Sequence, residues 1–529
     1  MVNKKLRVWL PLIFSIVMIA GMYFGYQLSG RTGNKKGFFS SNKRGSLQEV
    51  VDLIRLNYVD PIELDSLQYN AIQEMMNKLD PHSVYFPPVE LKAANEELEG
   101  NFEGIGVEFN VFRDTVNVVY VIPEGPSDKA GMQIGDKIIK VNDSSLTSRI
   151  LSTDEIKSLI RGSRGSKAQL VILRGAEQKN ITVTRGKIPV FSIDAAYMMD
   201  KTRGYIKLNK FTKTSYEEFM RSMEELQKQG LKELILDLRG NGGGFMDEAV
   251  DMADEFLDGD KLIVYTEGAH NKKREYRCKR QGLFEKGKLT VLVDELSASA
   301  SEVLAGALQD WCRATIIGRR TFGKGLVQEQ FSLGDGSAIR LTVARYFTPQ
   351  GRSIQRAYDK GNQAYIDEIL ERVTAPDSLM TSLDTIKGKL YKTVCGDTVY
   401  GGGGILPDVI VPADTIGYPR AINRMLINGS FNSYVYQYYL QHKKEIDQYK
   451  SPSDFASRFG KLNEMWNGLV AITAKDSMSL QSVSAREKAA VQKRLLASLA
   501  RYRWRNQGFY HVLNADDPVV KKALSGVGR

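Results

Sequence analysis

Cysteine and histidine are scarce in this chain, which has three cysteines and four histidines among 529 residues. The cysteines, Cys278, Cys312 and Cys395, lie far apart, and neither a CxxC pair nor a cysteine–histidine spacing typical of a zinc site occurs. These absences exclude a disulfide framework, although they allow one disulfide and one free thiol. We therefore expect no metal ion and no other cofactor, and we expect the scattered histidines to be structural or surface residues.

Acidic residues are absent from the first 45 positions, which carry eight of the eleven net positive charges. The rest of the chain is therefore close to neutral, and its charge does not indicate a nucleic-acid partner. A basic segment of this kind is typical of the flank of a membrane-spanning helix.

Charge of either sign is absent from Val8 to Gly30. A helix over these residues would span roughly 34 Å at about 1.5 Å per residue, which is enough to cross the hydrocarbon core of a bilayer. Basic residues precede the run and favour a cytoplasmic N-terminus. We predict an uncleaved signal anchor in residues 1–30 and a flexible basic linker over 31–45, with a cleaved signal peptide as the alternative. Both interpretations place the globular part outside the cytoplasm, on the periplasmic side of a bacterial inner membrane.

The remainder of the chain divides by its hydrophobic patterns. Apolar residues recur at helical spacing from Ser46 to Leu79 with a break at Asp60-Pro61, so we predict two helices there, within a helical N-terminal region over 46–95. Residues 188–413 alternate strand and helix patterns, as a layered α/β (α+β) domain does. Residues 414–529 return to helical patterns rich in tyrosine, lysine and arginine, and we predict a separate helical domain of unknown role.

Residues 96–187 read as short strands separated by glycine turns, with one amphipathic helix at Thr153–Ile160. Three blocks follow in order: GIGV at 104–107, GPSDKAGMQIGDKIIKVN at 125–142 and IRGSRGSKAQLVILR at 160–174. This segment resembles a PDZ domain. The resemblance implies that a peptide adds as a strand beside the helix, with its terminal carboxylate bound by the amides of the loop Gly104, Ile105, Gly106 and Val107. A small β domain that binds no ligand is the alternative.

Two glycine-rich stretches come close to nucleotide-binding motifs, but each fails a requirement. Gly240 and Gly242 begin a GxGxxG pattern whose third glycine is replaced by Phe245. Residues 318–324 match GxxxxGK, but Gly325 follows where a phosphate loop needs serine or threonine for Mg²⁺. A nucleoside triphosphatase is therefore not expected.

The stretch Thr290–Asp310 reads as a strand, a turn of small residues and the start of a helix. Such a junction directs side-chain hydroxyls and free helix amides at one spot. The turn offers three candidate nucleophiles, Ser297, Ser299 and Ser301, and the pattern alone does not choose between them.

Lys324 is the candidate base for that serine. Lysine accepts a proton only when it is neutral, and burial without a nearby carboxylate favours the neutral form. No acidic residue occurs from Arg313 to Gln328, and Lys324 lies between two glycines and next to apolar residues. Gln328, four residues on, falls on the same side and can hydrogen-bond the lysine without adding charge. A structural or exposed loop lysine is the alternative.

Acyl transfer also needs donors for the tetrahedral oxyanion. The amide that follows the nucleophile is one candidate, which is Ala300 if Ser299 attacks. The flexible backbone of Gly242–Gly244 can turn a second amide inward.

Four motifs and the PDZ-like segment closely resemble the carboxyl-terminal processing peptidases, also called tail-specific proteases, over about residues 46–413. The motifs are LDPHS (79–83), DLRGNGGG (237–244), SASASE (297–302) and TFGKGLVQ (321–328). The resemblance implies a core of the ClpP/crotonase-like layered type, with Ser299 as nucleophile, Lys324 as general base and Gln328 as its assistant. It also implies an oxyanion amide at Gly243. Gly242 stands where many relatives carry proline, which leaves the stiffness of that loop open.

The sequence therefore predicts a membrane-anchored serine endopeptidase that cleaves extracytoplasmic proteins with exposed apolar C-termini. The PDZ-like segment is expected to bind those termini and to act as a lid, with Arg161 as a candidate switch contact. Helical regions at both ends leave a homo-oligomer or an adaptor protein open as a further partner. The competing hypothesis is a PDZ scaffold on an inactive protease fold.

Overall fold

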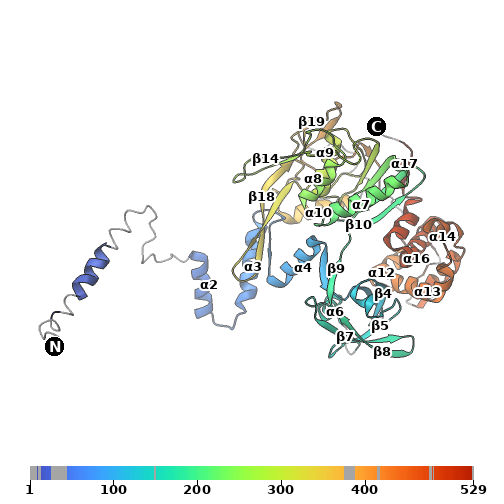
Figure 1. Ribbon diagram of the computed structural model, residues 1–529, viewed down its shortest axis with the longest axis horizontal. Helices are drawn as coiled ribbons and strands as arrows, with labels where there is room; N and C mark the ends of the chain where they lie inside the picture. The colour runs from blue at the N-terminus through green and yellow to red at the C-terminus, as the bar shows by residue number, and fades with distance from the viewer. Residues whose placement is uncertain are drawn as a thin grey trace. The chain divides into compact units, whose positions relative to one another are not determined.

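The structure, a computed structural model, divides into two compact units, residues 1–72 and 73–529. It describes residues 9, 14–24, 45–112, 114–147, 151–374, 388–413, 417–475, 479–480 and 482–526. Figure 1 shows the elements that these residues form.

In the first unit, residues 14–24 are helical. Helix α2 (Ser46–Asn57) follows, and α3 (Leu64–Asn77) starts in this unit, so the two predicted helices are present on either side of Asp60-Pro61. The other residues of the predicted anchor and the predicted linker up to residue 44 lie outside the described residues. Among the residues described, no helix has the length and apolar character needed to cross a membrane.

The PDZ-like domain of the second unit is built on an antiparallel sheet of order β3-β4-β5-β7-β8, in which β6 pairs with β5. Strand β3 is at the edge of this sheet, next to the GIGV loop. Its elements are β3 (Val107–Phe112), β4 (Thr115–Val121), α5 (Pro126–Lys129), β5 (Lys137–Val141), β6 (Ser144–Ser145), α6 (Thr153–Ile160), β7 (Lys167–Arg174) and β8 (Glu177–Thr184).

Helix α6 begins where the sequence predicted, because Ser152 and Glu155 form a capping box. The Ser152 hydroxyl accepts the amide of Glu155, and the Glu155 carboxylate accepts the amide of Ser152. Its residues Ile156 and Ile160 join the apolar core of the domain.

A pair of antiparallel strands connects the PDZ-like domain to the rest of the unit. Strand β2 (Asn101–Gly104) leads into the domain and β9 (Gly186–Pro189) leads out, with Asn101 opposite Pro189 and Gly104 opposite Gly186. Helix α4 (Pro88–Glu99) comes directly before β2 and ends at Gly100.

The centre of the second unit is a six-stranded sheet of order β10-β11-β12-β15-β16-β21. Strand β10 is antiparallel to β11 and the other pairs are parallel. The elements are β10 (Ile193–Met198), β11 (Arg203–Leu208), α7 (Ser215–Lys228), β12 (Glu233–Asp237), α8 (Met246–Asp254), β15 (Lys288–Val293), α9 (Ala300–Asp310), β16 (Thr315–Gly318) and β21 (Val409–Ile410).

This mixed α/β arrangement brings two predicted motifs together. Parallel strands end at the same edge of a sheet, and Asp237 at the end of β12 is opposite Leu292 near the end of β15. The glycine loop that follows β12 and the serine turn that follows β15 are therefore neighbours.

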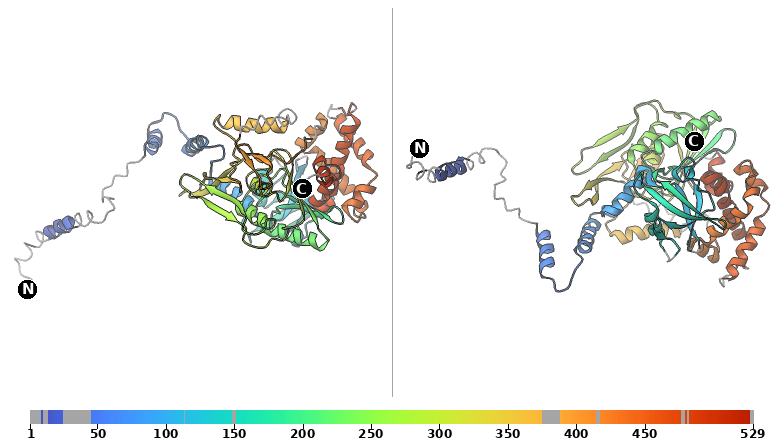
Figure 2. Two further views of the ribbon diagram at one scale, coloured as in Figure 1. Left: turned by 90° about the horizontal axis from the view of Figure 1, so that it is seen from above. Right: turned by 60° about the horizontal axis from the view of Figure 1, so that its bottom comes forward.

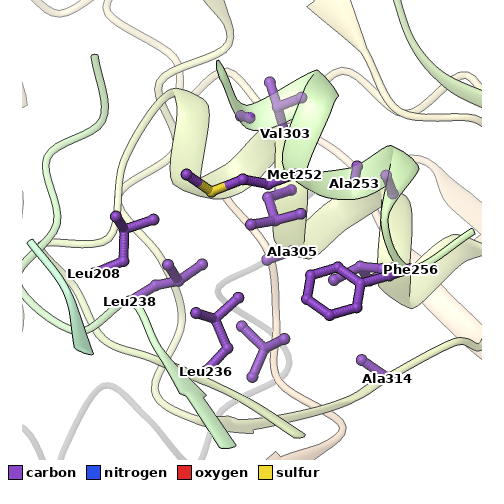
Figure 3. Packing of buried hydrophobic residues seen from close by; sticks show 14 of the residues in the cluster. Leu208, Leu236, Leu238, Met252, Ala253, Phe256, Val303, Ala305 and Ala314 are labelled. Carbon is purple, nitrogen blue, oxygen red and sulfur yellow. The ribbon is translucent and has the colours of Figure 1, made fainter. Parts of the chain in front are cut away.

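Helices cover the sheet on both faces. On one face, Leu208 of β11 and Leu236 of β12 face Met252 of α8 and Ala305 of α9 (Figure 3). The other face packs against α17 (Pro518–Leu524). Burial on both sides explains why β12 and β15 read as continuous apolar runs.

The unit contains a second sheet of order β1-β18-β13-β14, in which β17 pairs with β18. Its strands are β1 (Val84–Phe86), β13 (Leu262–Glu267), β14 (Arg274–Arg277), β17 (Leu326–Ser332) and β18 (Ala338–Phe347). They are followed along the chain by α10 (Asn362–Thr374), β19 (Leu390–Lys392) and β20 (Thr398–Tyr400).

A disulfide joins Cys312, after α9, to Cys395, between β19 and β20. Cys278 is a buried free thiol. The one bridge and one free thiol that the sequence allowed are therefore both present.

The C-terminal helices lie beside both the PDZ-like domain and the central sheet (Figures 1 and 2). They are α12 (Arg420–Ile427), α13 (Ser430–Ile446), α14 (Pro452–Arg458), α15 (Leu462–Lys475), α16 (Ala485–Asn514) and α17. Helix α16 is interrupted at Trp504 and Arg505, where Arg505 has a φ of 58°.

The interruption divides α16 between two partners. Arg505 pairs with Glu108 of β3, and its guanidinium lies 3.5 Å from the ring centroid of Tyr120. Beyond the interruption, Asn506 and Asn514 bind residues of β10. The aromatic and basic run of this helix, residues 502–505, therefore packs between domains.

Candidate active site

The serine turn places Ser299 between β15 and α9, in a cavity of about 830 Å³. Ser299 has φ 56° and ψ −114°, a combination that a residue with a side chain rarely adopts. Ser297 and Ser301 are fully buried, and their hydroxyls donate to the carbonyls of Leu238 and Asn241, each at 2.9 Å. Of the three serines, Ser299 is thus the one that lines the cavity.

Glu302 connects the serine turn to the loop of Lys324. Its carboxylate is fully buried and accepts the amides of Ser299 and Lys324 at 2.9 Å each. It also accepts the Gly323 amide at 2.7 Å and the Thr321 hydroxyl at 2.5 Å. Burial raises the pKa of Glu302 to about 7, while the four donated hydrogen bonds act in the opposite direction.

Glu302 is the last residue of the SASASE motif, but no role was predicted for it from the sequence. The signal that was available is an acid in the first turn of a helix that is otherwise apolar and buried. Such a residue needs several donors, and here two separate loops supply them.

Lys324 lines the same cavity, and its Nζ donates to Gln328 Oε1 at 2.9 Å. Burial is the main cause that lowers the pKa of Lys324, and the positive charge of Arg340 adds to it. Asp80 and Glu302 act in the opposite direction. The sequence predicted a lysine without acidic neighbours. This is correct for residues close to Lys324 in the chain, but the fold brings Asp80 and Glu302 near it. Both carboxylates are occupied by backbone amides, which limits their hold on the ammonium.

Gln328 is oriented by a segment from the other end of the chain. Its Nε2 donates to the carbonyl of His82, which turns Oε1 toward the lysine. Asp80 fixes this segment by accepting the amides of His82 and Ser83 at 2.8 and 2.9 Å. The ring of His82 is half-buried, its Nε2 lies 3.0 Å from the hydroxyl of Tyr365, and burial lowers its pKa to about 3. The LDPHS motif therefore supports the lysine site through its backbone.

Ser299 and Lys324 both line one cavity. In the described part of the chain, no hydrogen bond joins Ser299 Oγ to Lys324 Nζ. Catalytic hydrogen bonds of this kind often tighten only when substrate binds.

The two amides predicted to bind the oxyanion, those of Gly243 and Ala300, differ in whether they already donate a hydrogen bond. The amide of Gly243 donates to Asn241 Oδ1 at 2.9 Å, so it is occupied. Ala300 is the first residue of α9, a position whose amide has no partner within the helix. Gly243 also lies so close to the serine turn that a Cβ there would be 2.8 Å from Ser299 Cβ. The role of Gly243 as an oxyanion donor stays a prediction.

The GIGV loop joins β2 to β3. Gly104 ends β2, Val107 begins β3, Ile105 is buried, and Gly106 has a φ of 78°. The carbonyls of Ile105 and Gly106 accept amides from within the domain at 2.9 and 3.0 Å. A role of these four residues in binding a terminal carboxylate stays a prediction.

Arg161 links the PDZ-like domain to helix α4, which borders the cavity of Ser299. It pairs with Glu96 of α4 at 3.0 Å, and its guanidinium lies 4.6 Å from the ring centroid of Phe102. Residues 95 and 97–99 of the same helix line the cavity of Ser299. Arg161 therefore contacts a helix whose neighbouring residues line the cavity, and its role as a switch contact stays a prediction.

Three protein families match segments of this chain. Residues 202–361 match peptidase family S41, residues 118–174 match the PDZ domain family, and residues 421–505 match a family of unknown function (DUF8443). The second match falls in the PDZ-like domain, which we now call the PDZ domain.

Curated relatives include proteins named "Probable CtpA-like serine protease". The one from Staphylococcus epidermidis strain ATCC 12228 is 33% identical over 358 residues, 66% of this chain and 72% of the relative. The one from Staphylococcus aureus strain N315 is 35% identical over 343 residues, 64% of this chain and 67% of the relative.

The chain is also similar to two solved structures. The photosystem II D1 C-terminal processing protease is 27% identical, with a TM-score of 0.36, and the match covers 72% of this chain and 88% of that one. The PDZ domain of a carboxy-terminal protease from Vibrio cholerae, in complex with peptide, is 27% identical with a TM-score of 0.15. That match covers 17% of this chain and 97% of the domain.

The chain is thus a serine-type protease with a PDZ domain, and it acts on peptide or protein substrates. It belongs to the carboxyl-terminal processing peptidases of peptidase family S41.

Proposed function

We propose that Ser299 and Lys324 form the catalytic dyad of this protease. The observation that carries the proposal is their joint placement: both line one cavity, and both backbone amides donate to the buried carboxylate of Glu302. One buried group therefore sets the relative position of nucleophile and base.

The reaction follows from the protonation state of Lys324. Neutral Lys324 takes the proton of Ser299 Oγ as the oxygen attacks the substrate carbonyl carbon. The resulting oxyanion is held by the amide of Ala300 and by an amide of the glycine loop. Protonated Lys324 then gives the proton to the leaving amine, which leaves an acyl-serine. Water hydrolyses this ester by the same steps, with Lys324 again as base.

Gln328 assists by fixing the base. Its Oε1 accepts a hydrogen bond from Lys324 Nζ, and its Nε2 is held by the carbonyl of His82. This geometry supports the role because it orients the lysine without a charge that would favour the ammonium.

Gly243 serves as the second oxyanion donor only after its amide leaves Asn241 Oδ1. Its close approach to Ser299 supports the assignment. We propose that substrate in the cavity draws this amide inward.

The proposed substrates are extracytoplasmic proteins with exposed apolar C-termini. The edge position of β3 beside the GIGV loop supports capture of a terminal strand by the PDZ domain. The uncharged run from Val8 to Gly30 supports a single-pass anchor in a bacterial inner membrane. The Cys312–Cys395 disulfide supports an oxidising compartment such as the periplasm. A homo-oligomer or an adaptor remains part of the proposal.

The proposed core architecture is the ClpP/crotonase-like layered type that the resemblance implies. The parallel part of the central sheet, with helices on both faces, is consistent with that type.

The dyad is tested with the full-length protein in detergent and an unstructured protein substrate with an apolar C-terminus. Wild type is expected to cleave it, and Ser299→Ala and Lys324→Ala are each expected to lower kcat/KM by about 1000-fold or more, as loss of a nucleophile or its base does. Ser297→Ala is the matched control in the same turn and is expected to retain cleavage per folded molecule.

Two outcomes would contradict the dyad. Cleavage that survives Ser299→Ala would remove Ser299 as nucleophile. Binding of the tail without cleavage by wild type would favour the competing hypothesis of a PDZ scaffold on an inactive fold.

A further inference from the structure

The cavity of Ser299 carries an uncompensated positive charge. Among its described lining residues, four have basic side chains: Lys210, Lys213, Lys324 and Arg340. Lys210 pairs with Glu97 and Lys213 pairs with Glu99, both from α4. Lys324 acts as a neutral base in the proposed mechanism, which leaves Arg340.

Arg340 has neighbours that hold it in place but do not neutralise it. One terminal nitrogen donates to Gln330 Oε1 at 3.1 Å, and the guanidinium lies 4.8 Å from the ring centroid of Phe86. Within the described residues, no carboxylate lies within 4 Å of its nitrogens. Burial lowers the pKa of Arg340, and no acidic neighbour opposes that effect. A half-buried charge without a counter-charge is costly unless a ligand supplies one.

The chemistry of the guanidinium selects the ligand. Arginine presents five N–H donors in a planar fork that fits a carboxylate with two parallel hydrogen bonds. The single bond to Gln330 leaves most of these donors for a ligand in the cavity.

The register of β17 and β18 sets the place of Arg340 relative to the base. Gln328, which binds Lys324, is opposite Thr342, and Gln330 is opposite Arg340. Two residues along a strand are about 7 Å. An extended peptide advances by a similar length over two residues, so a group bound by Arg340 is within about two residues of the scissile bond.

We propose that Arg340 forms an anion subsite of the protease cavity and binds a carboxylate of the peptide substrate close to the scissile bond. The carboxylate is either an Asp or Glu side chain or the α-carboxylate of a chain end. The inference rests on the proposed Ser299/Lys324 site and names a specificity of that site.

The same charge also acts on Lys324, so the loss of Arg340 changes two quantities. It removes a donor to the substrate, and it removes a positive charge that helps to keep Lys324 neutral. The second effect is the same for acidic and neutral substrates. A ratio between two such substrates therefore isolates recognition.

The experiment uses full-length protein in detergent and peptides of otherwise uncharged sequence. One set carries a single Glu at successive positions on both sides of the cleaved bond, each matched by a Gln peptide. A second set compares a free C-terminal acid with the amide. The measured quantity is the acid-to-neutral ratio of kcat/KM for wild type, Arg340→Gln and Arg340→Lys, with Arg345→Gln as control. Arg345 is on the same strand but is exposed and outside the cavity lining.

Wild type is expected to prefer the acid by about tenfold at one position, as a charge-assisted hydrogen bond does, mainly through KM. Arg340→Gln is expected to bring the ratio to about one, Arg340→Lys to restore part of it, and Arg345→Gln to leave it unchanged. A ratio that depends on Arg340 in the Glu and Gln peptides indicates a side-chain carboxylate. A ratio that depends on Arg340 in the free-acid and amide peptides indicates an α-carboxylate. The GIGV loop is intact in every variant, so its contribution to α-carboxylate binding cancels.

A wild-type ratio of one at every position, or a preference that survives Arg340→Gln, overturns the subsite. The same peptides are also measured for binding to Ser299→Ala and Ser299→Ala/Arg340→Gln proteins. This comparison reports on the subsite without cleavage. If wild type cleaves no peptide, the dyad proposal fails while the binding ratio still decides the subsite.

Discussion

The two sides of the catalytic cavity are built in different ways. Ser299 is set by its backbone, which has an unusual conformation at a strand-to-helix turn and packs against the glycine loop. Lys324 is set by the side chains of Gln328 and Arg340 and, through Gln328, by the backbone of His82 from a distant segment. A nucleophile needs exposure and position, which a tight turn supplies. A lysine base needs a particular electrostatic environment, which only tertiary structure supplies.

The largest effect on activity is expected from a substitution that removes only the proton-accepting ability of Lys324. Lys324→Arg keeps the charge and much of the length of the side chain, but arginine stays protonated and cannot accept a proton. We expect kcat to fall by about 1000-fold or more, with little change in the thermal midpoint, because the loss is one of chemistry.

A pH profile sharpens this expectation. For wild type, kcat/KM should rise with pH along a limb whose pKa lies below the ordinary lysine value of 10.5, since burial and Arg340 lower the pKa of Lys324. A limb at or above the ordinary value would contradict a desolvated base.

A smaller loss of activity is expected from substitution of Glu302, whose carboxylate accepts the amides of both Ser299 and Lys324. Glu302→Gln replaces one acceptor oxygen by an NH₂ group that faces backbone amides. Each buried donor left without an acceptor costs about 1–3 kcal/mol, so both the free energy of unfolding and kcat should drop. We expect roughly a 10- to 100-fold loss of kcat, a range that corresponds to about 1.4–2.8 kcal/mol.

The control for that substitution is Glu248→Gln. Glu248 accepts the hydroxyl of Ser215 and the amide of Tyr216 at the start of α7, outside the cavity. It should lower thermal stability in a similar way while activity per folded molecule is retained. Equal losses of kcat in the two variants would mean that Glu302 acts only on stability.

The smallest expected effect concerns stability at acidic pH, through His82. The folded protein holds His82 neutral because its pKa is lowered to about 3, whereas the unfolded chain binds a proton near the ordinary value of 6.5. The unfolded state therefore binds more protons between these values, and stability is lost as pH falls through 6.5. The loss should reach about 2 kcal/mol at pH 5.

His82→Gln should remove most of this pH dependence, because glutamine does not titrate and keeps the backbone carbonyl that Gln328 uses. The measurement is the free energy of unfolding by denaturant at pH 7.5 and pH 5. His270→Gln, at an exposed position, is the control and should leave the pH dependence unchanged. An unchanged slope in His82→Gln would show that other groups cause the acid sensitivity.

The sequence was informative where the determinants are local. The strand, the small-residue turn and the helix start around Ser299 follow from adjacent residues, and so do α6 with its capping box and the two helices before residue 80. The choice among three serines required a motif resemblance, because the acceptors that occupy Ser297 and Ser301 are carbonyls about 60 residues earlier.

The sequence was less informative where partners come from afar. Asp80 and Glu302 act on Lys324 although no acid is near it along the chain. The occupation of the Gly243 amide by Asn241 depends on how one loop folds back on itself. Arg505 has its partners Glu108 and Tyr120 in another domain, which no pattern near it in the chain indicates.

The paired strands β2 and β9 carry both covalent connections of the PDZ domain. A domain joined by a single strand can rotate about its linker, but here both connections run side by side as a hydrogen-bonded ribbon. The hydrogen bonds of such a ribbon oppose rotation about either strand and separation of the two strands, so the ribbon bends mainly in one direction. Helix α4 ends at Gly100, one residue before that ribbon, and its last turn lines the cavity of Ser299. The ribbon and the helix are thus consecutive in the chain, so a displacement of the ribbon would act directly on residues that line the cavity.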